Sequence, residues 1–117
     1  KLQEQKEKAV KKNSKLVKVD KTSISHNFKK IESMVCKHFE IRSSDLKSES
    51  RLADLVLARQ LIMFLAREHT SLSTIQIGEY LGGRNHTTVL FAVNKMKTLY
   101  KKDKEIKQLI QKLTKKL

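Results

Sequence analysis

The sequence contains no proline, and its three glycines lie close together at positions 78, 82 and 83. Proline and glycine disfavour a helix interior more than any other residues, so almost nothing in the chain interrupts helix formation. With 38% hydrophobic residues among 117, the chain is large enough for one domain with a modest core. We therefore predict an all-α fold, a compact domain of several helices.

The chain also has little that would support covalent or metal chemistry. Cys36 is the single cysteine, which excludes an internal disulfide and fits a reducing cytoplasm. Cys36 and His38 are two positions apart on a predicted helix and so point to different faces, and the other histidines have no metal-ligand spacing. No acidic pair and no nucleophile with a nearby base stands out. We expect no enzymatic activity, no metal and no cofactor in this chain.

Long hydrophobic runs are absent as well. The longest apolar stretch, residues 52–66, is broken by Asp54, Arg59 and Gln60 and is too short to span a bilayer. No signal peptide is visible, and the first residue is Lys rather than Met. We expect a cytoplasmic location and a chain that is a fragment of a longer protein.

Positive charge is in clear excess, with a formal net charge of +14. Residues 1–23 hold eight lysines against three acids and residues 101–117 hold seven against two, so the two ends carry +10 of this charge. Diffuse positive charge raises the affinity for any polyanion and does not identify which one. We interpret residues 1–22 as a basic helical or linker segment, which is most often just a solvated face, and residues 23–117 as the folded domain.

Apolar residues recur at helical spacing in five segments of this domain. The predicted helices are a first one capped by Ser25 or Asn27 and ending near residue 39, and then residues 51–68, 73–80, 86–100 and 104–115. The segment 51–68 is apolar around most of its circumference, so we expect it to be the buried central helix. Ser73 and Gln76 have the spacing of a capping box, and residues 42–50 are predicted to form a polar loop.

A sharp turn is predicted between the helices at 73–80 and 86–100. Gly82 and Gly83 supply a permissive backbone there, and Asn85 is a good N-cap for the second helix. The turn resembles an anion-binding glycine loop, but it lacks the GxxxxGK[ST] spacing of a nucleotide site, so we expect a DNA phosphate there at most.

The second of these helices would bury one stripe and expose another. Its inward stripe is Val89, Ala92, Val93, Met96 and Leu99. His86 and Thr87 project from the first turn on the free polar side. In helix-turn-helix proteins these positions reach base edges in the major groove, and the alternative is that both side chains only satisfy backbone amides at the helix start.

The same region resembles a known protein family. The residues that carry the resemblance are Ile77, Gly78, Leu81, Gly82, Gly83, Arg84, Asn85, His86, Thr87, Thr88, Val89, Ala92, Lys95 and Met96. This run strongly resembles the signature of the C-terminal domain, domain IV, of the DnaA family of bacterial chromosomal replication initiators. The resemblance extends more loosely over residues 24–117, including residues 59–70 as the helix before the turn. It implies sequence-specific binding of double-stranded DNA at origin elements called DnaA boxes.

The resemblance assigns several residues to the major groove. His86 and Thr87 match residues that read bases of the DnaA box, and a threonine methyl can pack on the C5-methyl of thymine. Arg84 and Thr88, on either side of them, are expected at the same groove.

Two further major-groove positions depart from the usual family pattern. Asn85 stands where the family usually has Asp, and since an amide can donate as well as accept, base preference there is expected to relax. Ile75 replaces a residue, often proline, that touches a thymine methyl in relatives. Ile75 is alternatively a core residue.

Arg51 matches a family arginine that enters the minor groove, where narrow A·T-rich segments attract a guanidinium. The alternative is a solvated loop arginine. Relatives carry more basic residues and a proline in the loop after it, where this chain has Leu52, Ala53, Asp54 and Ala58. We expect weaker phosphate anchoring by this loop.

Phosphate contacts are expected from Arg59, Arg67 and Ser73. Arg59 and Arg67 are eight residues apart and so face roughly the same side of an apolar helix, where a charge needs water or a partner. Arg67 matches a basic residue of the family that contacts the DNA backbone. The intramolecular alternative for these arginines, and for Arg84, is an ion pair with one of three acids, Glu68, Asp54 or Glu79.

In the family, an ATP-binding domain that oligomerises precedes this one. That domain is absent from the chain, so we expect neither ATP binding nor self-assembly from these residues. Residues 1–22 resemble the connector between the two domains, which has been linked to acidic phospholipids. The alternative function is therefore a basic module that docks on an anionic membrane or an acidic protein, which we rank below DNA binding because the apolar stripe of this segment is thin.

Overall fold

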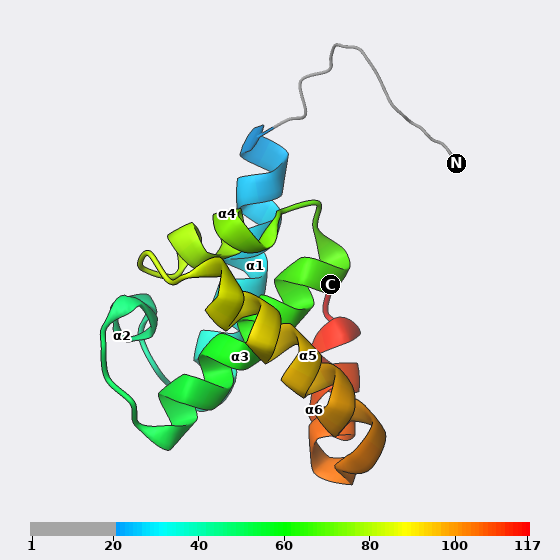
Figure 1. Ribbon diagram of the computed structural model, residues 1–117. Helices are drawn as coiled ribbons and strands as arrows, with labels where there is room; N and C mark the ends of the chain where they lie inside the picture. Colours follow the sequence, from blue (N-terminus) through cyan, green and yellow to red (C-terminus); the bar gives the residue numbers. More distant parts are fainter. Residues whose placement is uncertain (1–20) are drawn as a thin grey trace.

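The computed structural model describes the backbone of residues 21–117 and the side chains from Asn27 onward. The described part contains six helices (Figure 1), α1 (Lys21–Phe39), α2 (Ser43–Lys47), α3 (Ala53–His69), α4 (Thr74–Tyr80), α5 (His86–Lys102) and α6 (Lys104–Thr114). The prediction of an all-α domain is confirmed. The predicted start of the first helix was wrong, since α1 begins at Lys21, ahead of Ser25 and Asn27. Most of the predicted basic segment, residues 1–20, lies outside the described residues.

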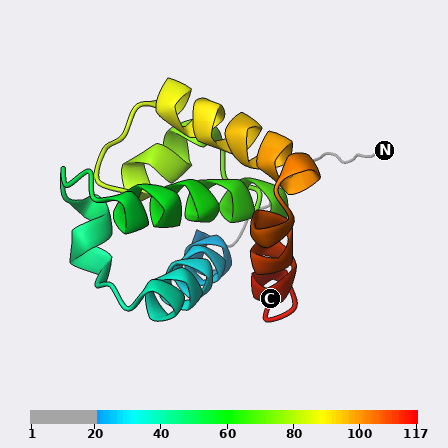
Figure 2. The same ribbon diagram turned by 90° about the horizontal axis from the view of Figure 1, so that it is seen from below.

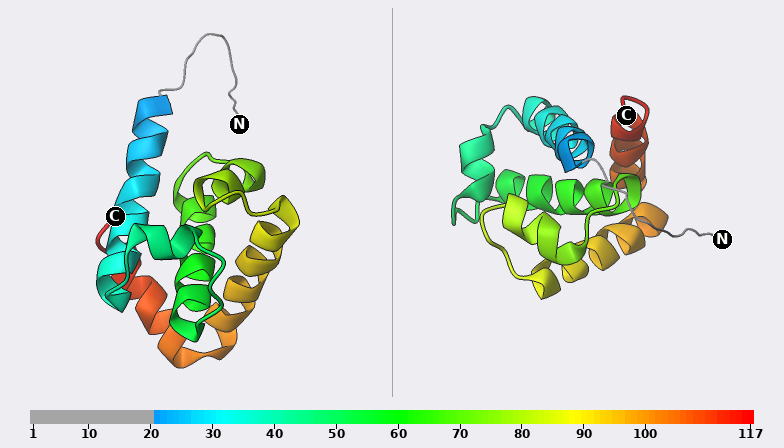
Figure 3. Two further views of the ribbon diagram at one scale, coloured as in Figure 1. Left: turned by 90° about the vertical axis from the view of Figure 1, so that its left-hand side faces the viewer. Right: turned by 90° about the horizontal axis from the view of Figure 1, so that it is seen from above.

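The central position of α3 organises the fold. Helices α4 and α5 lie on one side of it, and α1 and α6 lie on the other (Figures 2 and 3). Leu61, Ile62 and Leu65 have no exposed surface, because α3 is apolar on nearly every face. The prediction of a buried central helix is confirmed. Leu52 is an exception, being 69% exposed, since it precedes the helix as its N-cap residue.

The segment predicted as a polar loop at residues 42–50 contains the short helix α2. The Arg42 N–H donates a hydrogen bond to Oδ2 of Asp45 at 3.1 Å, which closes the first turn of this helix. Leu46 is completely buried and fixes α2 on the core. Five residues are too few to display a helical period, which is why the apolar pattern did not predict α2.

Helix α1 and helix α6 close the core from the other side. The rings of Phe28 in α1 and Tyr80 in α4 stack with centroids 4.9 Å apart, which joins α1 to the end of α4. In α6, Ile110 and Leu113 are buried, and Ile106 and Leu109 pack against the core cluster. The helix predicted over residues 104–115 is therefore confirmed, and its apolar residues dock on the core.

Candidate nucleic-acid interface

Helix α4 begins with the capping box that the sequence predicted. The Gln76 N–H donates to Oγ of Ser73 at 3.1 Å, and the Ser73 N–H donates to Oε1 of Gln76 at 2.9 Å. Both contacts satisfy amide groups that a helix start leaves free. Ser73 remains exposed, so its hydroxyl hydrogen is still available to an outside acceptor.

The turn between α4 and α5 converges on one backbone carbonyl. The Gly78 carbonyl accepts the N–H groups of Leu81 at 3.1 Å, Gly83 at 3.0 Å and Arg84 at 2.8 Å. Gly82 and Gly83 have φ of 86° and 80°, a left-handed conformation that favours glycine. A Cβ on Gly78 would lie 2.0 Å from the Arg84 carbonyl oxygen, so the turn needs glycine there as well.

Asn85 caps the second helix, as predicted. Its Oδ1 accepts the Thr87 N–H at 2.8 Å and the Thr87 hydroxyl at 2.7 Å. Helix α5 consequently begins at His86. The Thr87 hydroxyl donates its hydrogen to Asn85, so its oxygen remains free to accept a hydrogen bond from an outside donor.

The first turn of α5 is exposed on one side and buried on the other. Asn85, His86, Thr87 and Thr88 are exposed. On the inner side Val89, Ala92, Val93 and Met96 are buried, and Leu99 is half-buried. The predicted separation into an apolar stripe and a free polar edge is confirmed for this helix.

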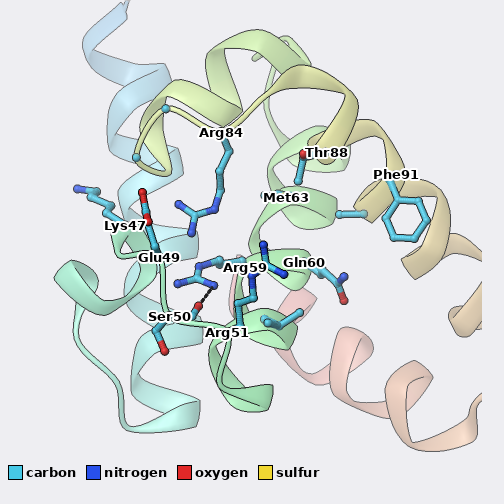
Figure 4. Close-up of a pocket in the computed structure, with 14 residues that line it drawn as sticks. Lys47, Glu49, Ser50, Arg51, Arg59, Gln60, Met63, Arg84, Thr88 and Phe91 are labelled. Carbon is cyan, nitrogen blue, oxygen red and sulfur yellow. Dashed lines mark hydrogen bonds between the residues drawn. The ribbon is translucent and has the colours of Figure 1, made fainter.

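A groove of about 720 Å³ runs beside this polar edge (Figure 4). We call it the recognition groove. It is lined by Lys47, Glu49, Ser50, Arg51, Val56, Arg59, Gln60, Met63, Gly82, Gly83, Arg84, Thr88, Phe91 and Ala92. The loop between α2 and α3 forms one wall and α5 forms the opposite wall, with the arginine side chains between them. Four of the lining residues are cationic at neutral pH and one is acidic, so the groove is suited to an anionic strand.

Arg59 does not reach out to a phosphate in this structure, which corrects the prediction for this residue. It is only 6% exposed, and its guanidinium donates to four backbone carbonyls that precede α3. These acceptors are Leu46 at 2.7 Å, Ser50 at 2.6 Å, Asp45 at 3.0 Å and Ser48 at 2.9 Å. Acidic partners were also the wrong alternative, since the acceptors are carbonyls. Arg59 therefore holds the loop that carries Arg51.

Arg84 is likewise turned inward rather than toward a base. Its Nη2 donates to the Ser48 carbonyl at 2.6 Å and its Nη1 donates to the Leu81 carbonyl. The predicted major-groove contact is corrected, because these hydrogen bonds direct the half-buried side chain toward the loop after α2. Burial lowers the pKa of both Arg84 and Arg59 from its ordinary value, and for Arg59 the nearby Arg84 charge acts in the same direction.

The remaining predicted site residues are accessible. Arg51 is exposed at the mouth of the recognition groove. Arg67 is exposed near the end of α3 and makes one long contact, from Nη1 to the Leu72 carbonyl at 3.3 Å. Ile75 is 57% exposed, which excludes the alternative that it belongs to the core. Arg59 and Arg67 are in different environments, because only Arg59 is buried.

Phe91 is a surface feature that the sequence interpretation missed. This ring is 64% exposed on α5, four residues after Thr87, and it lines the recognition groove. The signal available in the sequence was a large apolar residue outside the inward stripe of the helix, next to Leu90, which is also exposed. An exposed phenylalanine on this edge gives a partner an apolar contact beside the polar ones.

Among the described side chains, no group of three or more His, Cys, Asp or Glu could hold a metal ion. None of the described helices is long and apolar enough to cross a membrane.

The geometry of α3, α4 and α5 defines a helix-turn-helix domain whose second helix opens with an exposed polar edge. The family model for the bacterial DnaA protein helix-turn-helix matches residues 28–96. This match covers more than half of the chain, so the chain belongs to the bacterial DnaA family in the region of its helix-turn-helix.

Similar proteins carry the same family name. The chain is 42% identical over 80 residues to a chromosomal replication initiator protein DnaA of Gloeobacter violaceus, which covers 68% of this chain and 18% of that protein. It is 43% identical over 81 residues to that of Crocosphaera subtropica, covering 69% and 18%. It is 44% identical over 87 residues to that of Methylacidiphilum infernorum, covering 74% and 19%. The chain thus spans under a fifth of the length of these relatives.

Proposed function

We propose that this chain binds double-stranded DNA sequence-specifically at DnaA-box elements, as the DNA-binding domain of a bacterial replication initiator. The observation that carries the proposal is the exposed edge formed by His86 and Thr87 at the start of α5. In a helix-turn-helix these positions enter the major groove. The proposed role is binding without catalysis, in the bacterial cytoplasm on chromosomal DNA.

In the proposed complex, different residues around the recognition groove would contact bases and phosphates. With α5 in the major groove and Arg51 in the adjacent minor groove, the strand that separates the two grooves would lie between them. Asn85, His86, Thr87, Thr88 and Ile75 would face bases. Phosphate contacts would supply most of the affinity, and base edges would supply the discrimination.

Phosphates on the flanks of this strand would be held by Arg67 and Ser73. Both side chains are exposed, and Ser73 lies at the start of α4 where a hydroxyl can donate to a phosphate oxygen. Arg59 and Arg84 would act indirectly, because their hydrogen bonds position the loop that presents Arg51. This arrangement differs from one in which every arginine of the site contacts DNA.

Selection of bound duplexes from a random pool tests the proposal directly. We expect a single preferred sequence, and we expect His86→Ala or Thr87→Ala to weaken binding to it by about 1–3 kcal/mol with little effect on random duplex. Thr98→Ala is the matched control, since Thr98 is an exposed threonine near the far end of α5. A pool that yields no preferred sequence, or equal losses on both duplexes, would refute base recognition by these residues.

Acidic phospholipids are the second candidate partner, through residues 1–22. This segment has the lysine content for an electrostatic contact, although residues 1–20 lie outside the described residues. Co-sedimentation with vesicles of anionic lipid, before and after deletion of residues 1–20, measures its contribution. Undiminished binding after the deletion would exclude the segment.

A further inference from the structure

A second basic surface lies on the side of the domain that faces away from α5. Helices α1 and α6 are both on the opposite side of α3 from α5 (Figure 2). Between them is a cleft of about 680 Å³, lined by Lys29, Lys30, Ser33, Met34, Lys37, His38, Lys112 and Lys116. We call this surface the basic cleft. It shares no lining residue with the recognition groove, so the two can be occupied at the same time.

The charge of the basic cleft exceeds that of the recognition groove. Five lysines and a histidine line it, and none of its lining residues is acidic. The recognition groove has four cations and one acid, and two of those cations are hydrogen-bonded to carbonyls within the protein. Glu105 is on the same stripe of α6, seven residues before Lys112, and is not part of the lining. The basic cleft is therefore the more strongly attractive of the two for an anionic strand.

The spacing of the lysines suits a phosphodiester backbone. Lys30, Ser33 and Lys37 are three and four residues apart and so share one face of α1. Lys30 and Lys37 are separated by about 10 Å along the helix axis at 1.5 Å per residue. This separation is comparable with the distance between neighbouring phosphates of one strand, so Lys30 and Lys37 can each contact a phosphate. Lys112 and Lys116 on α6 line the same cleft.

The chemistry of the basic cleft favours nucleic acid over a membrane or a protein. Among the side chains described from Asn27 onward, six large apolar ones are exposed and none of them lines it, these being Leu52, Ile75, Tyr80, Leu90, Phe91 and Leu117. A membrane contact gains from inserted apolar side chains, and a protein contact gains from aromatic or arginine anchors. Lysine is a point charge without bidentate geometry, which is sufficient for a sequence-independent phosphate contact.

We propose that the basic cleft holds the backbone of a second duplex, so that one chain bridges two segments of DNA. The inference rests on the proposed function, since the first segment is the one held by α5. Once that segment is bound, a neighbouring segment of the same molecule is present at high effective concentration, and weak phosphate contacts are then enough to retain it. Binding of the second segment is independent of its sequence and sensitive to salt.

A capture experiment tests this bridging. An immobilised duplex with the selected sequence is saturated with protein, and a labelled duplex of random sequence is then added at increasing concentration. The test variant is Lys37→Gln with Lys112→Gln and Lys116→Gln. The matched control is Lys101→Gln with Lys102→Gln and Lys104→Gln, which removes the same charge from exposed lysines outside both grooves. Helical content and melting temperature are compared to show that both variants fold.

We expect the wild-type chain and the control to capture the second duplex. The test variant should reduce capture by about tenfold or more, while its affinity for the first duplex stays within about threefold. The salt slope of capture, meaning the fall of the logarithm of the binding constant with the logarithm of salt concentration, should decrease by about three units. Since residues 1–20 are unchanged in all three proteins, the difference between variants reports on the basic cleft alone.

Three outcomes would overturn the bridging proposal. They are no capture by the wild-type chain, equal losses in the two triple variants, and retention of anionic vesicles but not of duplex by the basic cleft. The first step of the assay reports separately on the proposed function, because a chain without preference among immobilised duplexes refutes that function. In that case the two triple variants, compared on random-sequence duplex, still decide whether the basic cleft binds DNA.

Discussion

Arg59 and Arg84 donate hydrogen bonds to the same backbone carbonyl, that of Ser48, from Nη2 of each side chain at 2.9 Å and 2.6 Å. Two like charges meet at this oxygen because each guanidinium also has further carbonyl acceptors that share its positive charge. Arg59 comes from α3 and Arg84 from the turn before α5. The loop after α2 is thereby attached both to α3 and to the turn between α4 and α5.

Arg59 and Arg67 should therefore separate into a structural and a DNA-contacting role. Arg59→Ala removes hydrogen bonds to four backbone carbonyls, of which those of Asp45 and Ser48 keep another donor. We therefore expect the free energy of unfolding to fall by about 3 kcal/mol. Arg67→Ala removes an exposed side chain and should change it by no more than about 0.5 kcal/mol. Urea denaturation of both variants measures these differences.

DNA titrations at several salt concentrations complete this comparison. We expect Arg67→Ala to reduce the salt slope by about one unit on selected and random duplex alike. An Arg59→Ala variant that folds as stably as the wild type but has a shallower salt slope would show that Arg59 turns outward to a phosphate. An unchanged slope for Arg67→Ala would instead indicate that its contact with the Leu72 carbonyl persists on DNA.

Alanine at the three glycines should destabilise the domain to different degrees. At Gly83 the added Cβ meets nothing within 4 Å, so the left-handed backbone alone costs about 1–2 kcal/mol. At Gly82 the same strain is joined by a Cβ 2.8 Å from the Lys47 carbonyl oxygen, and at Gly78 the Cβ would overlap the Arg84 carbonyl. Chemical denaturation should give losses that increase from Gly83→Ala through Gly82→Ala to Gly78→Ala. A Gly83→Ala loss equal to the other two would contradict this order.

Asn85→Asp should separate the capping role of this residue from its base preference. A carboxylate can accept the Thr87 N–H as Oδ1 of Asn85 does, so the free energy of unfolding should stay level or rise slightly. Asn85→Ala removes the cap and should cost about 1 kcal/mol. On DNA, the loss of the amide donor should move selection toward a cytosine amino group at the facing base pair. Identical selected sequences for Asn85→Asp and the wild type would show that Asn85 does not face a base.

Phe91 should matter for DNA and not for folding. Because the ring is 64% exposed, Phe91→Ala should change the free energy of unfolding by about 0.5 kcal/mol at most. Covering about 40 Å² of the ring on DNA is worth about 1 kcal/mol, which predicts roughly fivefold weaker binding to the selected duplex. Leu117→Ala is the control, as an exposed apolar residue outside both grooves. Equal affinities for Phe91→Ala and Leu117→Ala would remove Phe91 from the interface.

The apolar pattern predicted most of the fold because, in the longer helices, the buried residues are those that recur at helical spacing. The inward stripe of α5 and the apolar circumference of α3 are properties of the helices themselves, so they could be read without tertiary information. Helix α2 was not predicted because its only buried residue, Leu46, has no apolar partner at helical spacing within the five residues of the helix. The start of α1 was predicted wrongly because Ser25 and Asn27 are residue types that favour an N-cap, yet both lie within the helix.

The polar edge of the site was predictable, whereas the roles of two arginines were not. Asn85 caps its own helix through a contact two residues away, which sequence spacing reveals. Arg59 and Arg84 both bind the Ser48 carbonyl, which is 11 residues away from Arg59 and 36 residues away from Arg84 in the sequence. Every residue has a backbone carbonyl, so the residue types in a sequence do not indicate which carbonyl accepts from an arginine. The sequence therefore shows no partner for Arg59 or Arg84, although both are hydrogen-bonded in the folded chain.

The hydrogen bond from Arg59 to the Ser50 carbonyl also affects how the neighbouring Arg51 meets a duplex. A loop held at the preceding peptide has already lost most of its conformational entropy when the chain folds, so little remains to be lost on association. Arg51 is thus preorganised on an otherwise irregular segment. A loop with few cations of its own can in this way still present one arginine with little backbone ordering cost at the moment of encounter.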